Sequence, residues 1–189
     1  MARESEQVFL ADPGTLMSTT HEVDGDLRVR LRLARPTDAA GVRSFLEGLS
    51  NETRHRRFFT AMPSVPEHVV RHFTYFNPRD RMVVAAVTFR EGSEVVLGLA
   101  DIVMDQTGVA ELAVVVDDSV QSCGVGKLLT EVIASLALRR GATHLRAELL
   151  EHNVPMLRLM ERLGRTVRSV EDGTSMVYTR LSDAALRAA

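Results

Sequence analysis

Residues 114–129 read VVVDDSVQSCGVGKLL and decide how the rest of the chain is interpreted. The valines end a β-strand, two glycines lie in the loop that follows, and apolar residues at helical spacing then begin a long helix. The first backbone N–H groups of a helix have no intrahelical acceptor, and the helix dipole is positive at that end. A strand, a glycine-containing loop and a helix start therefore predict an anion site, which a phosphate group would fill.

The spacing excludes two common nucleotide-binding motifs. A P-loop has Ser or Thr after Gly-Lys and a glycine five residues before the second one, whereas Leu128 follows Lys127 and position 121 is Gln. The dinucleotide fingerprint has a third glycine where Leu129 stands. A loop that serves only to start a helix stays open as an alternative, although two spaced glycines exceed what a helix cap requires.

Hydrophobic periodicity on both sides of the loop predicts one mixed α/β domain with antiparallel and parallel strand pairs. Upstream, the expected elements are a half-buried strand at 27–33, apolar residues at helical spacing over 42–49, helices at 51–59 (with Asn51 as N-cap) and 66–73, and a three-stranded antiparallel meander at 82–89, 95–104 and 109–116. Downstream, they are a helix that ends at Gly141, a strand at 144–150, a helix with Pro155 in its first turn, and strands at 166–170 and 175–181.

Length and composition indicate a single domain without disulfides. The 189 residues suit one domain, which we expect at 27–183, between a flexible N-terminal arm at 1–26 and a C-terminal tail at 184–189. The net charge of −2 argues against nucleic-acid binding by bulk charge, and the single cysteine excludes a disulfide framework. We expect neither a signal peptide nor a membrane span, and hence a cytoplasmic protein.

Residues 121–126 also fit a family signature in full. In the GNAT superfamily of acyl-CoA-dependent N-acetyltransferases, Arg or Gln is followed by two residues, Gly, one residue, and Gly or Ala after the fourth strand. The chain resembles this superfamily over residues 28–181, because the element order matches as well. A narrower likeness to the catalytic domain of bacterial Pat-type protein lysine acetyltransferases is carried by 35–38, 49–59, 110–114 and 153–159.

The resemblance implies a GNAT-like mixed sheet whose fourth and fifth strands pair in parallel and splay apart for acetyl-CoA. The backbone amides from Gln121 to Lys127 would hold the pyrophosphate, the strand ending at Val116 would pair with the pantetheine arm and donate to the oxyanion, and Asn153 would contact that arm. The expected cofactor-binding residues are Val114, Val115, Val116, Gln121, Ser122, Cys123, Gly124, Val125, Gly126, Lys127 and Asn153. No metal is expected, since His68 and His72 have no third ligand beside them.

Glu111 is the candidate general base. Deprotonating a lysine amine of pKa ~10.4 at pH 7 costs about 4.6 kcal/mol, so a base is useful. Glu111 is an acid within an apolar strand, where burial would raise its pKa, and it stands where the Pat-like pattern has its glutamate. An acid on the solvent face of the strand is the alternative. No tyrosine follows Asn153 by four residues to protonate the leaving thiolate, because Leu157 stands there.

The function expected is N-acetyl transfer from acetyl-CoA to a primary amine, preferably a protein lysine. Two alternatives stay open: acetylation of a small amine such as an antibiotic, polyamine or amino acid, and a non-catalytic acyl-CoA-binding module. The basic cluster 54–57 is interpreted as a solvated helix face, with an acidic acceptor or the cofactor phosphates as its other potential contacts. Edge strands near the C-terminus offer pairing surfaces for a homodimer.

Overall fold

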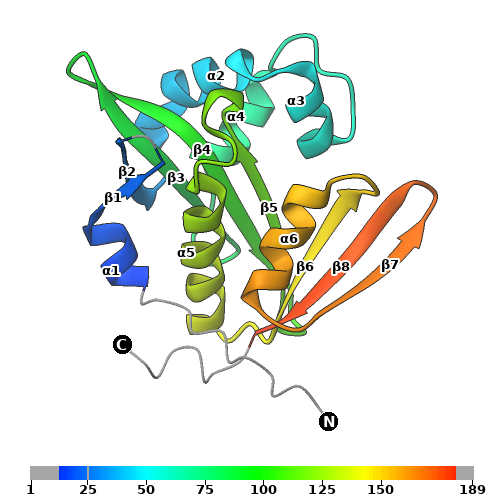
Figure 1. Ribbon diagram of the computed structural model, residues 1–189. Coiled ribbons are helices and arrows are strands. Elements are labelled where there is room, and N and C mark those ends of the chain that lie inside the picture. The colour runs from blue at the N-terminus through cyan, green and yellow to red at the C-terminus, as the bar shows by residue number, and fades with distance from the viewer. Residues whose placement is uncertain (1–12, 25, 182–189) are drawn as a thin grey trace.

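One eight-stranded sheet runs through the molecule (Figure 1). The computed structural model describes residues 13–24 and 26–181. The strands lie in the order β1-β2-β3-β4-β5-β6-β8-β7. Their bounds are β1 Thr20–Val23, β2 Leu27–Leu33, β3 Arg81–Arg90, β4 Ser93–Met104, β5 Val109–Val116, β6 His144–Leu150, β7 Thr166–Glu171 and β8 Thr174–Arg180. The helices are α1 Pro13–Ser18, α2 Ala39–Gly48, α3 Asn51–Phe58, α4 Glu67–Thr74, α5 Val125–Arg139 and α6 Val154–Leu163, with 3-10 turns at Pro36–Asp38 and Asp118–Val120.

The predicted meander and the parallel pair are both confirmed. Strands β2 to β5 pair antiparallel in sequence order, and β5 pairs parallel with β6. The parallel register covers only three pairs, Val109–His144, Ala110–Leu145 and Glu111–Arg146. Beyond Glu111 the two strands separate, so the sheet opens between them as the family resemblance implies (Figure 1).

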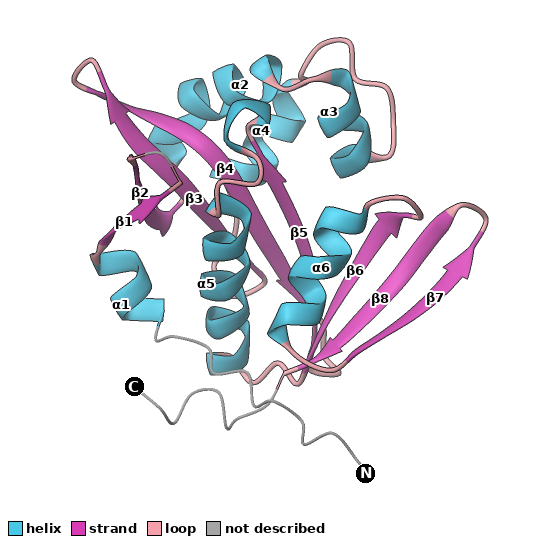
Figure 2. Cartoon of the chain, in the orientation of Figure 1, coloured by secondary structure: helices cyan, strands magenta, loops and turns pink. Residues whose placement is uncertain are grey.

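Helices cover both faces of the sheet, which explains the uninterrupted apolar runs of β3 and β4. Helices α1, α5 and α6 pack with residues such as Leu97 and Ile102 on one face. Helices α2 and α4 pack with Val83 and Leu99 on the other. Figure 2 shows α5 in front of the central strands and α2 and α4 behind them. The core is thus two layers of side chains separated by the sheet.

Part of the segment that the sequence predicts to be a flexible N-terminal arm is folded against the domain. Residues 13–18 form α1, whose Leu16 is buried in the core beside α5, and β1 adds an antiparallel strand to β2. Nonlocal packing holds these two elements, which are too short to show a period of their own. Residues 1–12 and the expected tail at 184–189 lie outside the described residues.

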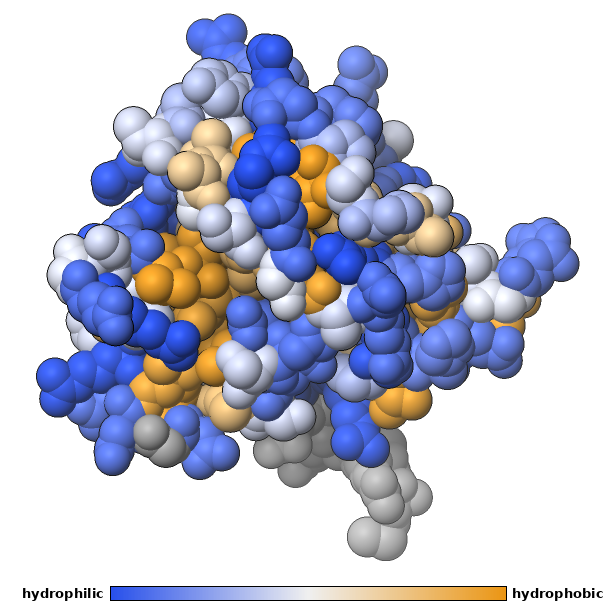
Figure 3. All heavy atoms as spheres, turned by 90° about the horizontal axis from the view of Figure 1, so that it is seen from above, coloured by the Kyte–Doolittle hydropathy of each residue, from blue (hydrophilic) through white to orange (hydrophobic). Residues whose placement is uncertain are grey.

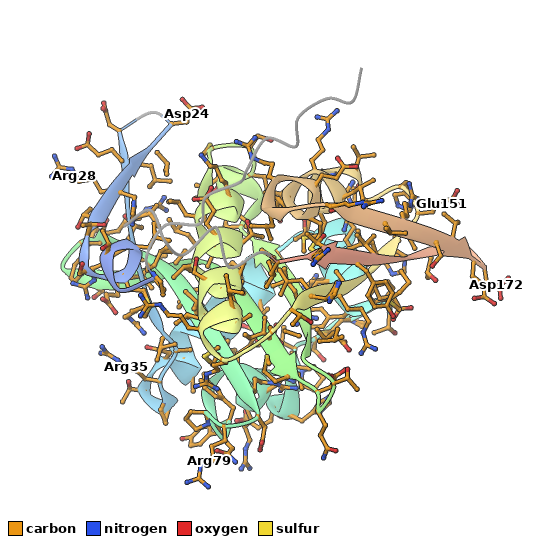
Figure 4. The ribbon with its side chains drawn as sticks, turned by 90° about the horizontal axis from the view of Figure 1, so that it is seen from below. Asp24, Arg28, Arg35, Arg79, Glu151 and Asp172 are labelled. Atoms are coloured by element: carbon orange, nitrogen blue, oxygen red, sulfur yellow. The ribbon has the colours of Figure 1, made fainter. Side chains whose placement is uncertain are left out.

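The predicted bounds of the other strands and of α3 and α4 agree with the structure to within two residues, but one cap differs. The N-cap of α3 is Ser50 rather than Asn51, and the Ser50 side chain accepts a hydrogen bond from the Thr53 N–H. The ends of the sheet lie on opposite sides of the molecule, marked by Asp24 near β1 and Asp172 in the β7–β8 turn (Figure 4). Among the described helices, none has the length and apolarity needed to cross a membrane.

Candidate active site

A cavity of about 370 Å³ lies where β5 and β6 separate. Four elements form its wall: the end of β5, the loop and first turn of α5, one side of α3, and α6 with its N-cap. The lining residues are Thr53, Arg56 and Arg57 of α3; Val114, Val115 and Val116; Gln121, Ser122, Gly124, Gly126 and Lys127; and Asn153, Pro155, Met156, Leu159 and Arg162. In the view from above, hydrophobic atoms are visible between hydrophilic side chains near the middle of the face (Figure 3).

Nine of the eleven predicted cofactor-binding residues line this cavity. The two others do not. Val125 is fully buried in the core, and the Cys123 thiol points back to the Gln121 carbonyl at 3.6 Å. The cavity thus brings together the segment 114–127 and residue 153, which lies 26 positions after the end of that segment.

The loop before α5 presents unpaired backbone donors. Its chain turns through left-handed conformations at Ser122 and Gly124, with φ of 65° and 94°. In the part of the chain that the structure describes, the N–H groups of Ser122, Gly124, Val125, Gly126 and Lys127 have no acceptor. Several donors beside a positive helix end and a lysine form a cradle that fits a diphosphate.

Asp118 connects this loop to α3 through hydrogen bonds. Its carboxylate accepts hydrogen bonds from the Ser50 N–H, the Ser50 hydroxyl and the Thr53 hydroxyl at 2.8, 2.8 and 2.6 Å. Burial would raise the pKa of Asp118, but these hydrogen bonds outweigh it and hold the pKa below its ordinary value. The Gln121 side chain then donates to the Thr53 hydroxyl and the Val116 carbonyl, each at 3.1 Å. No sequence pattern predicts this linkage, because Ser50 and Asp118 are 68 residues apart.

Asn153 is the N-cap of α6 as well as part of the cavity wall. Its side-chain oxygen accepts the Met156 N–H at 3.3 Å, and Pro155 occupies the first turn as predicted. The cap orients the start of α6 toward the gap between β5 and β6. One residue therefore fixes a helix end and presents its amide at the cavity.

Glu111 lies in a second cavity, of about 280 Å³, beside the first. The two cavities share Arg56, Arg57, Val114 and Met156. The expected burial of Glu111 is wrong: its side chain is 56% exposed and forms an ion pair with Arg146. The parallel register places Arg146 directly opposite, and that hydrogen bond raises the pKa of Arg146. An apolar strand pattern does not show which part of a sheet face is left uncovered by helices. The exposure of Glu111 could therefore not be predicted from the sequence.

The basic cluster on α3 is only partly the solvated face that the sequence predicts. The Arg57 side chain is 15% exposed, binds the buried Asp101 at 2.7 Å, and stacks on Phe58 and Phe73. His72 is half-buried and also binds Asp101, at 3.2 Å. Burial would raise the pKa of Asp101, but the charge of Arg57 and the His72 hydrogen bond hold it below its ordinary value. Among the described residues, no cluster of three or more metal-ligating side chains occurs.

Comparison with known proteins agrees with this geometry. The model of the acetyltransferase (GNAT) family matches residues 46–164. The chain belongs to the GNAT acetyltransferase family. The matched region contains the strand, loop and helix of the first cavity, as well as Glu111 and Asn153. The predicted family, fold class and enzyme class, an acyl-CoA-dependent N-acetyltransferase, are therefore confirmed.

Solved structures give the same fold. The GNAT domain of S. lividans PAT is 28% identical to this GNAT chain with a TM-score of 0.75, over 86% of this chain and 96% of that one. A putative acetyltransferase from Salmonella typhimurium, yncA with its cofactor acetyl-CoA, is 18% identical with a TM-score of 0.62, over 82% and 95%. A cAMP-binding acyltransferase from Mycobacterium smegmatis is 24% identical with a TM-score of 0.57, over 87% of this chain and 47% of that one.

Proposed function

We propose that this enzyme transfers an acetyl group from acetyl-CoA to the side-chain amine of a protein lysine. The observation that supports the acceptor class is the likeness to the S. lividans PAT domain over nearly the whole of that domain, together with the Pat-like residues at 110–114 and 153–159. The cavity pair fits the reaction, since one cavity can hold the cofactor and the adjoining one the incoming amine.

In this proposal the first cavity holds acetyl-CoA. The free N–H groups from Ser122 to Lys127 bind the diphosphate, and the Lys127 ammonium adds charge at the mouth. None of the described strands pairs with the end of β5 beyond Glu111 on its β6 side, so its backbone groups can pair with the pantetheine amides as an added strand would. The thioester then reaches Val114, where the cavities meet.

Glu111 is the proposed general base on the acceptor side. The lysine nitrogen attacks the thioester carbon, the C–N bond forms, and the C–S bond breaks as the coenzyme A thiolate leaves. The proton that the nitrogen loses passes to the Glu111 carboxylate, directly or through a water molecule. Arg146 orients that carboxylate through their ion pair, so an exposed glutamate keeps one position at the cavity.

A small amine is the second candidate acceptor, because the size of the acceptor cavity suits a free amine as well as a lysine side chain. About 280 Å³ is close to the lower end of ligand pockets, roughly 300 Å³. A lysine side chain on a protein and a free amine of similar length would both fit. The two acceptors therefore have to be separated by assay.

The test is an acceptor panel assayed with acetyl-CoA: an acyl-CoA synthetase with a surface lysine, a lysine peptide, and free polyamines, amino acids and aminoglycosides. We expect mass spectrometry to find acetyl-lysine on the protein acceptor at a rate above that of the free amines. Turnover of a free amine alone would contradict the protein-lysine proposal. Coenzyme A binding without acetylation of any acceptor would indicate a binding module instead.

Glu111→Gln tests the base. We expect kcat to fall by about 10²–10³-fold, within the range for general-base catalysis, while the Kd for coenzyme A changes by less than about threefold, because Glu111 lies in the other cavity. Glu161→Gln, an exposed site on α6 outside both cavities, is the matched control and should leave kcat unchanged. Equal rates for Glu111→Gln and the wild type would exclude Glu111 as the base.

A further inference from the structure

Arg57 lies in the wall that the two cavities share and has hydrogen-bond donors to spare. Its guanidinium has five N–H groups, and among the described residues Asp101 is its one hydrogen-bond partner. Among the described residues, the Nε atoms of Arg54, Arg56 and Arg57 are all buried without a partner. Of these three arginines, Arg57 alone combines a place in both cavities with a bond to a buried carboxylate. Buried donors normally find acceptors, so a desolvated cation with unused donors at a cavity is arranged for a ligand atom.

A network of buried groups holds Arg57 in place. Asp101, on β4, binds it from one side, and the rings of Phe58 and Phe73 lie 5.0 and 5.5 Å from its guanidinium carbon. Arg81 donates to Nδ1 of His72 at 2.6 Å. Since arginine can only donate, His72 Nδ1 is the acceptor there, and Nε2 carries the hydrogen that goes to Asp101 at 3.2 Å. The carboxylate is thereby fixed from two directions.

The position of Arg57 indicates which atom of a bound thioester it would contact. The acyl group must lie where the cavities meet, because the thioester enters from one side and the amine from the other. Of the four shared residues, Val114 and Met156 are apolar, and Arg56 is paired with Glu52 on the surface of α3. Of the two shared arginines, Arg57 is the one that a buried carboxylate orients. It is therefore suited to donate a hydrogen bond to the oxygen on the acyl carbon.

We propose that Arg57 is a further catalytic residue, which donates to the acyl oxygen of the bound thioester, and that Asp101 is its positioning residue. As the amine nitrogen bonds to the carbonyl carbon, the π electrons move to the oxygen, which becomes an oxyanion. A fixed donor stabilises this charge as it develops. The carbonyl then re-forms, the C–S bond breaks, and Arg57 stays protonated throughout. The inference rests on acyl transfer by this family and not on the identity of the acceptor.

Arg57→Gln is the first test, with whichever acceptor the panel shows to be best. We expect kcat to fall by about 10²–10³-fold, as for loss of an oxyanion donor, with the Kd for coenzyme A within about threefold of the wild type by calorimetry. Arg54→Gln removes the same charge from the same helix at a residue that lines neither cavity, and should keep full activity. A change confined to the KM of the acceptor or to the Kd of coenzyme A would overturn the proposal.

Asp101→Asn and the double variant test positioning. We expect Asp101→Asn alone to lower kcat by about tenfold, and to cause no further loss in the Arg57→Gln background, because coupled residues are not additive. Additive losses would show that Asp101 acts on stability rather than through Arg57. If Arg57→Gln folds poorly, Arg57→Ala supplemented with millimolar guanidine should recover part of kcat, and absence of recovery in a folded variant would count against the proposal.

A spectroscopic readout needs no acceptor and so separates this inference from the proposed function. Infrared difference spectra of bound acetyl-CoA, labelled with carbon-13 at the thioester carbonyl, report hydrogen bonding to the acyl oxygen. We expect a lower carbonyl frequency on wild type than on Arg57→Gln, with Arg54→Gln equal to wild type. Identical frequencies would refute donation by Arg57 even if lysine acetylation is established. A shift without lysine acetylation would refute only the acceptor class.

Discussion

Gly124 turns the chain from the loop into α5 with a φ of 94°. A side chain there is strained whatever space surrounds it, at a cost of about 1–2 kcal/mol. We expect Gly124→Ala to lower the free energy of unfolding by about that amount and to weaken coenzyme A binding, because the neighbouring N–H groups would be reoriented. Urea denaturation and calorimetry measure the two effects.

Gly48 provides the matched control for Gly124. It lies at the end of α2 with no atom within 4 Å of an added Cβ and with no positive φ. Gly48→Ala should be neutral or stabilise by up to about 1 kcal/mol, with the Kd for coenzyme A unchanged. Equal losses of affinity in both variants would mean that the loop conformation at Gly124 has no role in binding.

At the scale of single residues, the sequence predicted which residues line the cavity better than it predicted their burial and their ion-pair partners. The motif that begins at Gln121 lines the cavity, because a short loop motif carries its own geometry. Asn153, which the family resemblance indicated, lines it as well. The exposure of Glu111 depends on Arg146 in another strand, and the burial of Arg57 depends on Asp101, 44 residues away. Such environments are products of tertiary packing that no local pattern encodes.

Asp118 joins two elements that both line the first cavity. It binds the N-terminus of α3 through Ser50 and Thr53, and Thr53 in turn accepts from Gln121 of the loop. Removing the carboxylate leaves these groups without their acceptor, at a cost of about 1–3 kcal/mol. We expect Asp118→Ala to lose that much stability and to raise the Kd for coenzyme A by about tenfold, which corresponds to roughly 1.4 kcal/mol.

Asp105→Ala is the comparison for Asp118. Asp105 likewise accepts several hydrogen bonds, among them those from the Thr107 and Val109 N–H groups, but it lies in a turn that contributes to neither cavity. Its loss should leave the Kd for coenzyme A unchanged by calorimetry. If Asp118→Ala likewise leaves that Kd unchanged, α3 and the loop are positioned independently of each other.

Strand β2 is tied to its neighbours by the buried Arg32. Its guanidinium binds Asp38 at 2.7 Å and Glu94 at 2.7 Å, which connects β2 to the turn before α2 and to β4. Burial would raise the pKa of Asp38, but the hydrogen bonds from the Arg32 side chain and the Arg35 N–H, together with the charges of these two arginines, outweigh it and the pKa is lowered. A carboxyl whose pKa is lower in the folded state stabilises the fold above its unfolded pKa, about 3.9, and loses that effect as pH falls through the folded value.

We therefore expect Asp38→Asn to reduce the free energy of unfolding at pH 7 by about 3 kcal/mol, the lower end for breaking a buried pair, since Glu94 still faces Arg32. The difference from wild type should shrink as pH falls below about 4 in urea titrations. Glu22→Gln breaks an ion pair with Arg28 that is more than 70% exposed and should cost less than about 1 kcal/mol at every pH. A deficit independent of pH would rule out the charge of Asp38 as its source.

Among helices and strands, periodicity predicted nearly every element, and the missed ones are short. Strands β5 and β6 have the predicted bounds, because a run of alternating or continuous apolar residues between turn signals is locally defined. Helix α1 has six residues and β1 has four. Their order comes from Leu16 in the core and from pairing with β2, which the sequence does not reveal.

At the scale of the whole molecule, the sheet has two parts, β1 to β5 and β6 to β8, and the described core joins them on one face of the sheet only. On the α5 and α6 side the core continues from β5 to β6 and β8, whereas on the α2 and α4 side the described core contains no residue of β6, β7 or β8. Only three register pairs connect β5 to β6. The opening proposed to hold the cofactor therefore lies where the fewest register pairs join neighbouring strands of the sheet.

Coenzyme A bound in this opening would touch both parts and should stabilise the whole fold. At a ligand concentration of about 100 times Kd the gain is roughly 2.7 kcal/mol, which for a domain of this size raises Tm by about 5–10 °C. Hydrogen exchange should show new protection at those N–H groups of 112–116 that face away from β4, because they pair with the pantetheine arm instead of a neighbouring strand. Adenosine 3′,5′-diphosphate lacks that arm and should raise Tm less, without protecting β5. Protection of the loop alone by both ligands would mean that the cofactor binds through its phosphates and leaves the two parts of the sheet unbridged.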